Sequence, residues 1–284
     1  MTDLDPRLHA YRPDLADARL SGKVNAARFV AGTARRVVVD AAPIKPAAST
    51  GTSLASEALR GEVFTVFDES PEGWAWGQLA TDGYVGYVPA NALGPLLPEP
   101  THRVSALRAH IFPGPDMKLP PRGALSFSSS LALAGEAVTR GTAYRLLAGG
   151  EGAIVASQVA PLDAPPENDF VAVAERFLGV VYLWGGRTSL GLDCSALVQL
   201  SLAAAGKNAP RDTDLQERML GEPLPGGTAG ALGRGDLIFW KGHVAILIDG
   251  EYAIHASGHH MAVVIEPLRE ALARIGAPTS VKRL

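Results

Sequence analysis

The sequence predicts an α+β domain, with helices packed on an antiparallel sheet, preceded by two small β-barrels. Three observations carry this prediction. Short apolar runs separated by Gly, Pro and Asp recur through residues 36–162, a pattern typical of small barrels. A run of helix formers, residues 195–205, follows a glycine-rich loop and ends at Gly206. Beyond it, apolar strands separated by turn residues indicate a β-meander over residues 236–257.

Length and composition limit the functional class. The chain has 284 residues, enough for two or three domains, and its 47% of apolar residues can build real cores. A net charge of −3 does not favour a nucleic-acid or polyanion partner. Residues 1–20 lack the apolar stretch of a secretory signal, and no run approaches the ~20 apolar residues of a membrane span. Because the single cysteine cannot form an internal disulfide, we expect a cytoplasmic protein.

The first barrel is expected within residues 36–98, after an N-terminal segment, residues 1–35, to which the sequence assigns no role. Residues 41–55 are rich in Pro, Ala, Ser, Thr and Gly and predict a long loop that interrupts the barrel. Trp74 and Trp76 are expected to pack in the barrel rather than contact a ligand. The predicted strands are Arg36–Asp40, Glu62–Phe67, Trp74–Gln78 and Gly86–Pro89.

A second, more degenerate barrel is predicted over residues 102–162, and a catalytic domain over residues 165–284. Apolar spacing near 3.6 predicts a helix over Phe170–Leu178 as the first element of the catalytic domain. The predicted strands of the second barrel are Val104–Phe112, Tyr144–Leu147 and Gly152–Ala156, and the predicted linkers are Leu96–Pro100 and Asp163–Asn168.

The only cysteine, Cys194, lies where the glycine-rich loop becomes a helix. Asp193 is a plausible N-cap, which places Cys194 in the first helical turn. The free backbone N–H groups and the helix dipole there favour a thiolate over a thiol. A lone cysteine is more often a small buried hydrophobe, so a nucleophile requires a nearby base.

Two strand histidines, His243 and His255, are the candidates for that base. Their side chains must lie on the same face of the sheet to cooperate. A two-residue Asp-Gly turn between the strands would put them on opposite faces. We therefore predict a three-residue loop, residues 249–251, with Gly250 in a left-handed conformation. His243 would then take the thiol proton and return it to the leaving amine, and His255 would hold the ring of His243.

Other interpretations of the histidines remain open at this point. Each alone could be a strand histidine satisfied by its neighbours. Cys194 with His255, His259 and His260 could also suggest zinc, but no Cys-x-x-Cys or His-Glu-x-x-His spacing supports a metal site. We expect no metal and no cofactor, and His259 and His260 on a loop.

Five motifs follow one another between residues 182 and 256: Tyr182-x-Trp-Gly-Gly, Gly191-x-Asp-Cys-Ser-x-Leu-Val-Gln, Gly235-Asp-Leu-Ile-Phe-Trp, Gly242-His-Val-x-Ile and Ile254-His-Ala. In this order they resemble the NlpC-type cysteine peptidases, compact papain-like hydrolases of bacterial cell-wall peptides. The resemblance covers about residues 165–284. It implies Cys194 as nucleophile, His243 as base, His255 as the orienting residue, and Tyr182 near the oxyanion site. Ala196 replaces a glycine found in many members, and we expect little consequence.

Three motifs of the first barrel resemble a bacterial SH3 domain: Gly-Glu-x-x-x-Val at 61–66, Gly-Trp-x-x-x-x-Leu at 73–79 and Asp-Gly-Tyr-x-Gly-Tyr-Val at 82–88. SH3-like barrels followed by the peptidase domain resemble cytoplasmic γ-D-glutamyl-L-diamino acid endopeptidases of the dipeptidyl-peptidase VI type. This resemblance implies a murein tripeptide or tetrapeptide substrate with a free N-terminal L-Ala.

A free ammonium group is costly to bury without carboxylates, so the implied substrate requires acidic partners. The resemblance assigns the amine to Asp212, and with less support to Glu62 and Tyr84 of the first barrel. Ser195 and Thr213 could hydrogen-bond the substrate backbone or carboxylate. The alternatives are a plain helix cap at Asp212, before a helix over 213–220, and ordinary barrel surface at Glu62 and Tyr84.

The sequence therefore predicts a cysteine endopeptidase of murein-peptide recycling that cuts between γ-D-glutamate and a diamino acid. Two other functions stay open. One is another Cys/His acyl-transfer enzyme, an amidase or transferase on the same core. The other is a catalytically silent protein that binds through its SH3-like barrels. Fast alkylation of the thiol would favour an active site over a structural cysteine.

Overall fold

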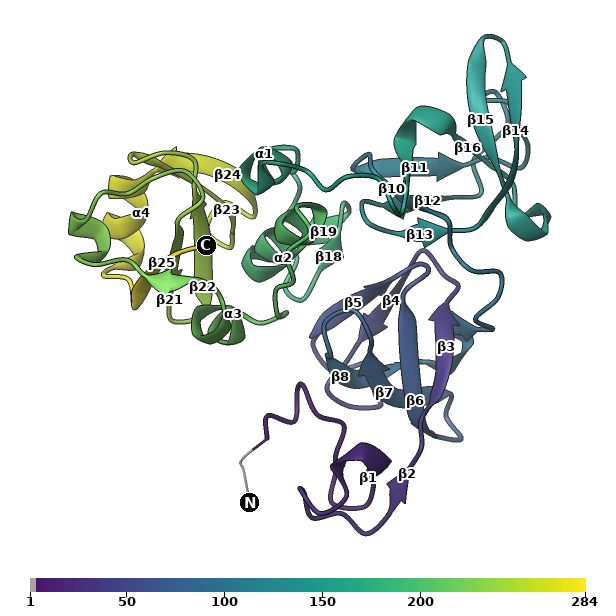
Figure 1. Ribbon diagram of the computed structural model, residues 1–284, viewed down its shortest axis with the longest axis horizontal. Coiled ribbons are helices and arrows are strands. Elements are labelled where there is room, and N and C mark those ends of the chain that lie inside the picture. Colours follow the sequence, from purple (N-terminus) through teal and green to yellow (C-terminus); the bar gives the residue numbers. More distant parts are fainter. Residues whose placement is uncertain (1–3) are drawn as a thin grey trace. The chain divides into compact units, whose positions relative to one another are not determined.

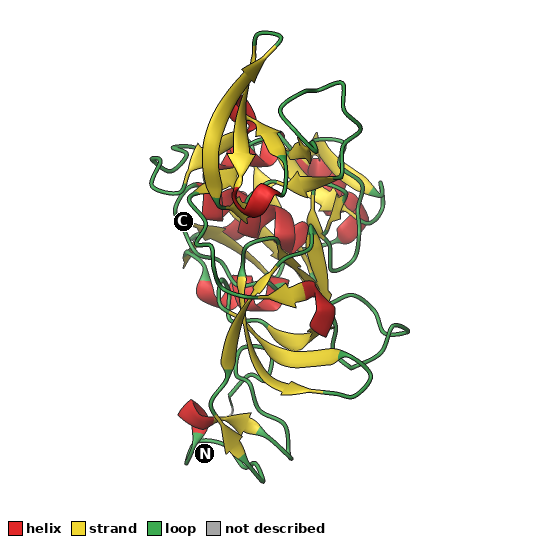
Figure 2. Cartoon of the chain, turned by 90° about the vertical axis from the view of Figure 1, so that its right-hand side faces the viewer, coloured by secondary structure: helices red, strands yellow, loops and turns green. Residues whose placement is uncertain are grey.

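The computed structural model describes residues 4–284, which divide into two compact units on either side of the Ala164–Pro165 bond (Figure 1). The boundary falls inside the predicted linker at 163–168. In the described chain, the α-helices belong to the second unit, and the first unit is built from strands, loops and short 3-10 helices (Figure 2). None of the described helices has the length and apolarity to cross a membrane.

The first barrel is a five-stranded sheet in the order β8-β7-β6-β3-β9, with β4 paired to β5 beside it. Alternation in β6 explains its core, because Phe64 and Val66 point inward and pack with Ala75 and Leu79 of β7. The bounds are β3 Thr33–Val37, β4 Ala41–Ile44, β5 Ser56–Leu59, β6 Val63–Glu69, β7 Trp74–Leu79, β8 Val85–Pro89, η2 Ala90–Ala92 and β9 Leu93–Gly94.

Two predictions for this barrel are wrong in their bounds. The strand expected over residues 36–40 runs instead from Thr33 to Val37, and the residues expected to form one loop, 41–55, begin with β4. Ala42 and Ile44 of β4 alternate into the core and are fully buried. Pro43 is tolerated between them because β4 belongs to a separate two-stranded sheet with β5.

The N-terminal segment packs on the first barrel. Ala10 and Leu15 are buried against Phe67 and Trp76. Arg12 lies over the ring of Trp76, 4.4 Å from its centroid. Trp74 and Trp76 are buried, at 9% and 3% exposure, as predicted for packing residues. The N-terminal segment forms, with Phe67 and Trp76, an apolar cluster separate from the barrel core. Its elements are β1 Ala16–Asp17, η1 Ala18–Leu20 and β2 Phe29–Val30.

The second barrel consists of three small sheets, ordered β13-β10-β17, β11-β12 and β14-β15-β16. The single strand expected over 104–112 is wrong, because the chain turns at 105–107 and its two halves, β10 and β11, join different sheets. The bounds are β10 His102–Val104, β11 Arg108–Ile111, β12 Gly123–Ser126, β13 Ser130–Leu131, β14 Leu133–Thr139, β15 Thr142–Leu147, η3 Ala148–Gly150, β16 Ala153–Val155, η4 Ala156–Gln158 and β17 Val159–Pro161.

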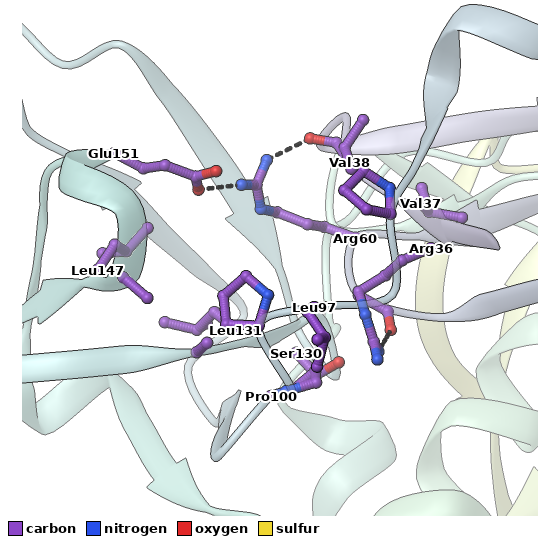
Figure 3. A pocket seen from close by; sticks show the side chains of 15 residues that line it. Arg36, Val37, Val38, Arg60, Leu97, Pro100, Ser130, Leu131, Leu147 and Glu151 are labelled. Carbon is purple, nitrogen blue, oxygen red and sulfur yellow. Dashed lines mark hydrogen bonds and ion pairs between the residues drawn. The ribbon is translucent and has the colours of Figure 1, made fainter.

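A cavity of about 180 Å³ lies between the two barrels, and two arginines line it (Figure 3). Arg60 donates to the carbonyl of Val38 and pairs with Glu151 of the second barrel. Arg36 donates to the carbonyl of Gly61 at 2.7 Å and to two further acceptors. Because both guanidinium groups already bond protein oxygens, this cavity belongs to the contact between the barrels.

The second unit is built around a six-stranded antiparallel sheet in the order β20-β25-β21-β22-β23-β24. Helix α2 packs on β22 and β23, and α4 contributes Leu268 to a core with Ala245, Leu247 and Ala253. This is the predicted arrangement of helices on an antiparallel sheet. The bounds are α1 Phe170–Glu175, β18 Arg187–Thr188, β19 Gly191–Leu192, α2 Cys194–Ala204, α3 Thr213–Met219, β20 Glu222–Pro223, η5 Gly227–Ala229, β21 Leu237–Trp240, β22 His243–Leu247, β23 Tyr252–Ser257, β24 Ala262–Pro267, α4 Leu268–Ile275 and β25 Ser280–Arg283.

The first helix, α1, is shorter than predicted. Its N-cap, Asp169, accepts the N–H groups of Val171 and Ala172. After Glu175 the chain closes in turns, with the N–H of Phe177 bonded to the carbonyl three residues earlier. The buried side chain of Phe177 therefore continues the apolar pattern without continuing the α-helix.

Candidate active site

Cys194 is the first residue of α2, as predicted. The carboxylate of Asp193 caps the helix by accepting the N–H of Ala196 at 2.9 Å. At the other end Gly206 has a φ of +73°, and its N–H and that of Lys207 bond the carbonyls of Ala203 and Leu202. This left-handed glycine ends the helix as the sequence indicated.

A buried ion pair fixes the loop in front of Cys194. Arg211 is only 1% exposed and donates to both carboxylate oxygens of Asp193, at 2.9 and 2.8 Å. The same carboxylate accepts the N–H of Gly185 at 3.0 Å, and Arg211 also donates to the carbonyl of Gly186 at 3.2 Å. The glycine-rich loop is thus tied to the start of α2 through one buried pair.

Sequence reasoning missed this role of Arg211. Arg211 directly precedes Asp212, the residue that the resemblance assigns to the substrate amine. An arginine within a largely apolar domain is the sequence signal that could have indicated a buried ion pair. Gly186 was also unexplained. A Cβ atom there would lie 2.5 Å from the carbonyl oxygen of Gly191, so the loop requires glycine at this position.

The two histidines lie on one face of the sheet because the loop between their strands has three residues. Ile248 and Tyr252 close it through a backbone hydrogen bond of 2.9 Å. The carboxylate of Asp249 accepts the N–H groups of Glu251 and Tyr252, each at 2.7 Å. The predicted loop length is confirmed, but the left-handed Gly250 is wrong, since its φ lies outside the left-handed region. The hydrogen bonds to the Asp249 side chain, rather than a left-handed glycine, stabilise the loop.

The geometry pairs the histidines directly. Nε2 of His243 lies 2.7 Å from Nδ1 of His255. Nε2 of His255 lies 2.7 Å from Oε1 of Glu266, which is 6% exposed. Burial lowers the pKa of His243 to about 4, and burial also lowers the pKa of His255. Both rings are therefore neutral near pH 7.

The sulfur of Cys194 lies 3.7 Å from the hydroxyl oxygen of Thr213. Val244, the residue that follows His243, lies in β22, against which the helix of Cys194 packs. Burial, reinforced by the Asp193 carboxylate, raises the pKa of Cys194 to about 11, although the Val244 N–H, Thr213 and Arg211 act in the opposite direction. Desolvation thus outweighs the helix-start donors that favour a thiolate, so the thiol needs a base to take its proton near pH 7.

Tyr182 is half-buried near the same sulfur. Burial raises its pKa to about 12, and the charges of Cys194 and Asp193 act in the same direction. Its backbone N–H bonds the carbonyl of Met261 at 2.9 Å, which fixes the chain at this point. The phenol is therefore protonated and can donate a hydrogen bond.

The three residues of the second unit that were predicted to bind substrate, Asp212, Thr213 and Ser195, lie at the starts of α3 and α2. Asp212 is the N-cap residue of α3, but its side chain does not make the capping hydrogen bond. Thr213 begins α3 beside the sulfur. Ser195 is 4% exposed, donates to Asp193 at 3.2 Å and accepts from Arg211 at 2.9 Å. The hydrogen bonds described for the Ser195 hydroxyl join Asp193 and Arg211, and its contact with substrate stays a prediction.

The two candidates in the first barrel serve its fold. The carboxylate of Glu62 accepts the N–H of Leu59 at 2.6 Å and closes the turn before β6. Tyr84 is 6% exposed and packs in the barrel core, so it is not the surface residue that the alternative interpretation assumed. Substrate binding by Glu62 and Tyr84 stays a prediction, and their bonds and packing within the barrel do not support it.

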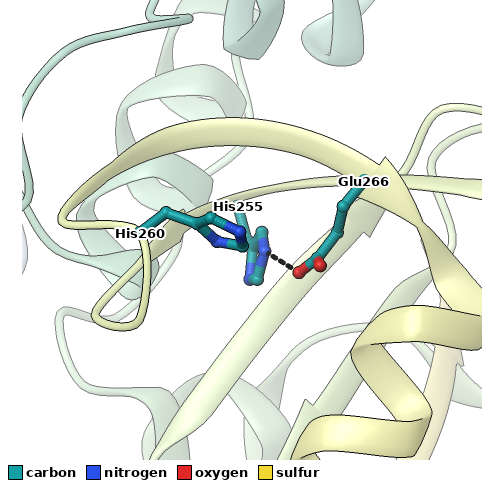
Figure 4. Close-up of side chains that lie close together, drawn as sticks. All are labelled: His255, His260 and Glu266. Carbon is teal, nitrogen blue, oxygen red and sulfur yellow. Dashed lines mark hydrogen bonds and ion pairs between the residues drawn. The ribbon is translucent and has the colours of Figure 1, made fainter.

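His255, His260 and Glu266 offer ligand atoms within 4.8 Å of one another (Figure 4). The donor set is nevertheless engaged in other bonds. Nδ1 of His255 faces His243, and both carboxylate oxygens of Glu266 accept from Arg274, a cation that a metal ion would have to displace. His259 and His260 lie on the turn between β23 and β24, as expected. We assign no metal to this cluster.

Comparison with known proteins gives two family matches. Residues 46–93 match the bacterial dipeptidyl-peptidase Sh3 domain, and residues 179–274 match the NlpC/P60 family. The first match covers one barrel, so the second barrel as an SH3 domain stays a prediction. The solved structure of an NlpC/P60 family protein from Bacillus cereus shares the fold, with a TM-score of 0.71 and 22% identity over 88% of this chain and 99% of that chain.

Curated relatives match over shorter stretches. Dipeptidyl-peptidase 6 of Lysinibacillus sphaericus is 34% identical over 90 residues, which is 32% of this chain and 32% of the relative. Gamma-D-glutamyl-L-lysine dipeptidyl-peptidase of Bacillus subtilis is 32% identical over 114 residues, 37% of each chain. The chain thus spans about a third of the length of these relatives. It carries a bacterial dipeptidyl-peptidase SH3 domain followed by an NlpC/P60 domain that contains Cys194, His243 and His255.

Proposed function

We propose that this protein is a cysteine endopeptidase that hydrolyses the bond between γ-D-glutamate and a diamino acid in murein peptides with a free N-terminal L-Ala. The observation that carries the proposal is the pairing of His243 with His255 at 2.7 Å, on two strands against which the helix that begins at Cys194 packs. The name of the relative from Bacillus subtilis, a gamma-D-glutamyl-L-lysine dipeptidyl-peptidase, supports the substrate class. The lone cysteine suits a reducing compartment, so we place the reaction in the cytoplasm, in cell-wall peptide recycling.

The reaction begins from a neutral thiol and a neutral imidazole. As the sulfur of Cys194 attacks the scissile carbonyl carbon, His243 takes the thiol proton. The carbonyl oxygen becomes an oxyanion, which the backbone N–H of Cys194 and the phenol of Tyr182 stabilise. His243 then gives its proton to the leaving amine of the diamino acid, and a thioester remains on the sulfur. Water, deprotonated by His243, hydrolyses that thioester and releases L-Ala-γ-D-Glu.

Asp212 is the residue we assign to the substrate ammonium. It precedes Thr213, whose hydroxyl lies 3.7 Å from the sulfur, so a peptide bound at the nucleophile passes close to this end of α3. A carboxylate there compensates the cost of desolvating the free amine. Acetylation of the amine removes the positive charge of the substrate, so the Asp212 carboxylate loses its ion pair with the ammonium group.

The test compares L-Ala-γ-D-Glu-diaminopimelate with its N-acetylated copy. We expect kcat/KM for the free amine to exceed that for the acetylated peptide, on the order of 10²-fold, and Asp212→Asn to remove most of this difference. Asp214→Asn, two residues further along the same helix and 54% exposed in its side chain, is the matched control and should leave the ratio unchanged. Equal cleavage of both peptides by the wild type would keep the peptidase but exclude the amine pocket. Cleavage of neither peptide, with hydrolysis of a simple dipeptide amide, would favour the amidase alternative.

A further inference from the structure

The hydrogen-bond chain behind His243 does not stop at His255. Glu266 lies in β24 opposite Ala253 of β23, so it shares a face with His255, two residues further along β23. Its Oε1 meets Nε2 of His255 at 2.7 Å. From α4, Arg274 donates to Oε2 at 2.8 Å and also bonds Oε1. The chain therefore runs from His243 through His255 to a carboxylate that is itself held by a guanidinium group.

Only one arrangement of protons satisfies this chain when both rings are neutral. An ionised carboxylate can only accept, so Nε2 of His255 must carry the proton that Glu266 accepts. Nδ1 of His255 then has a lone pair and must accept from His243. Nε2 of His243 must therefore carry a proton, which leaves Nδ1 of His243 without one.

We propose that Glu266, held by Arg274, fixes the tautomers of His255 and His243 and thereby leaves Nδ1 of His243 as the nitrogen that takes the thiol proton. Glu266 and Arg274 are positioning residues, since they act through the two rings. This role deepens the proposed function and rests on it, because it specifies which atom of His243 serves as the base for Cys194.

The groups around this chain favour the protonation states that it requires, an ionised Glu266 and two neutral histidine rings. The bonds from Arg274 lower the pKa of Glu266, and burial lowers the pKa of both histidines. His243 lies in β22, against which the helix of Cys194 packs, and Nε2 of its ring is engaged with His255. Nδ1 is thus the ring nitrogen that is not engaged with His255. The other titratable group close to His255 is His260, on the turn after β23.

The first arm of the test is nitrogen-15 NMR of the histidine rings in the full-length protein at pH 7. The seven histidines are assigned from spectra of single histidine substitutions. In the wild type, we expect His243 and His255 each to carry one proton, on Nε2. A proton on Nδ1 of His243, or two protons on either ring, would overturn the proposal. This arm needs neither substrate nor a Glu266 variant.

The second arm is Glu266→Gln, which replaces the carboxylate by a group that can also donate. The Nδ1-protonated tautomer of His255 should then become populated. We expect kcat for the tripeptide to fall on the order of 10²-fold with little change in KM, less than the ~10⁴-fold loss on replacing a carboxylate that contacts the base directly, because Glu266 acts through His255. Glu270→Gln, on α4 and 59% exposed in its side chain, is the matched control and should change neither the rings nor kcat. Unchanged ring spectra and kcat in a folded Glu266→Gln would contradict the role of Glu266.

The two arms separate this inference from the proposed function. If the wild type cuts no murein tripeptide, the proposed function fails, whereas the ring spectra still decide the tautomers. If the tripeptide is cut but His243 carries its proton on Nδ1, the function stands and the role of Glu266 is wrong.

Discussion

Replacement of Cys194 by alanine should abolish hydrolysis of L-Ala-γ-D-Glu-diaminopimelate. The sulfur is the atom that would form the thioester, and nothing else at the start of α2 can take its place, because the neighbouring hydroxyl of Ser195 is bonded to Asp193 and Arg211. Loss of a nucleophile in such a unit lowers kcat on the order of 10⁶-fold. Product release followed by chromatography and mass spectrometry measures the effect.

Ser201→Ala is the matched control for this substitution. Ser201 lies in the same helix, is fully buried, and its hydroxyl has no hydrogen-bond partner among the described residues. Its removal should leave kcat/KM within about twofold, because no bond is lost. A Cys194→Ala protein that retained more than a hundredth of the wild-type rate would contradict the assignment of the nucleophile.

Replacement of Arg211 by leucine should unfold the second unit or destabilise it severely. Arg211 is 1% exposed and neutralises the buried carboxylate of Asp193. Removing one partner of a buried ion pair costs about 3–5 kcal/mol, because the other charge stays buried without compensation. With a urea m-value of about 2 kcal/mol/M, the unfolding midpoint should fall by roughly 2 M.

Loss of the helical circular dichroism signal at increasing urea concentration follows this unfolding. The α-helices of the described chain all lie in the second unit, so this signal reports mainly on that unit. The control is Arg218→Leu on α3, whose side chain is 60% exposed and pairs with Asp214 at 3.7 Å. That change should cost less than about 0.5 kcal/mol. Equal midpoints for the two variants would show that the buried pair does not hold the helix start.

Much of the catalytic domain could be predicted because its signals are local. A glycine-rich loop, an N-cap aspartate and a terminal glycine define α2 within a few residues of one another. Side chains alternate between the two faces of a strand, so His243 and His255 can share a face only if the loop between their strands has an odd number of residues. The structure confirms the predicted three-residue loop.

What the sequence could not provide depends on contacts between distant residues. Arg211 reaches Asp193 across 18 positions, and Arg274 and His255 meet Glu266 from a different helix and a different strand. Nothing near Glu266 in the sequence marks it as more than a strand residue. The raised pKa of Cys194 also depends on the folded chain, because burial outweighs the effect of the helix start.

The barrel boundaries were missed because the strands there are short and ambiguous. Residues 41–44 have a composition typical of a loop, yet Ala42 and Ile44 fill the core of the first barrel. Residues 104–112 have the pattern of one continuous strand, yet they are divided between two strands, β10 and β11, that belong to different sheets. In both cases tertiary packing overrides the local preference.

The most direct measurement is the identity of the bond that the wild-type protein cuts in L-Ala-γ-D-Glu-diaminopimelate. The products of a time course are separated and weighed by mass spectrometry, with Cys194→Ala as the blank. The proposed function predicts free diaminopimelate and the dipeptide L-Ala-γ-D-Glu in equal amounts, with the wild type only. Release of free alanine instead, or an intact tripeptide after prolonged incubation with folded protein, would contradict it.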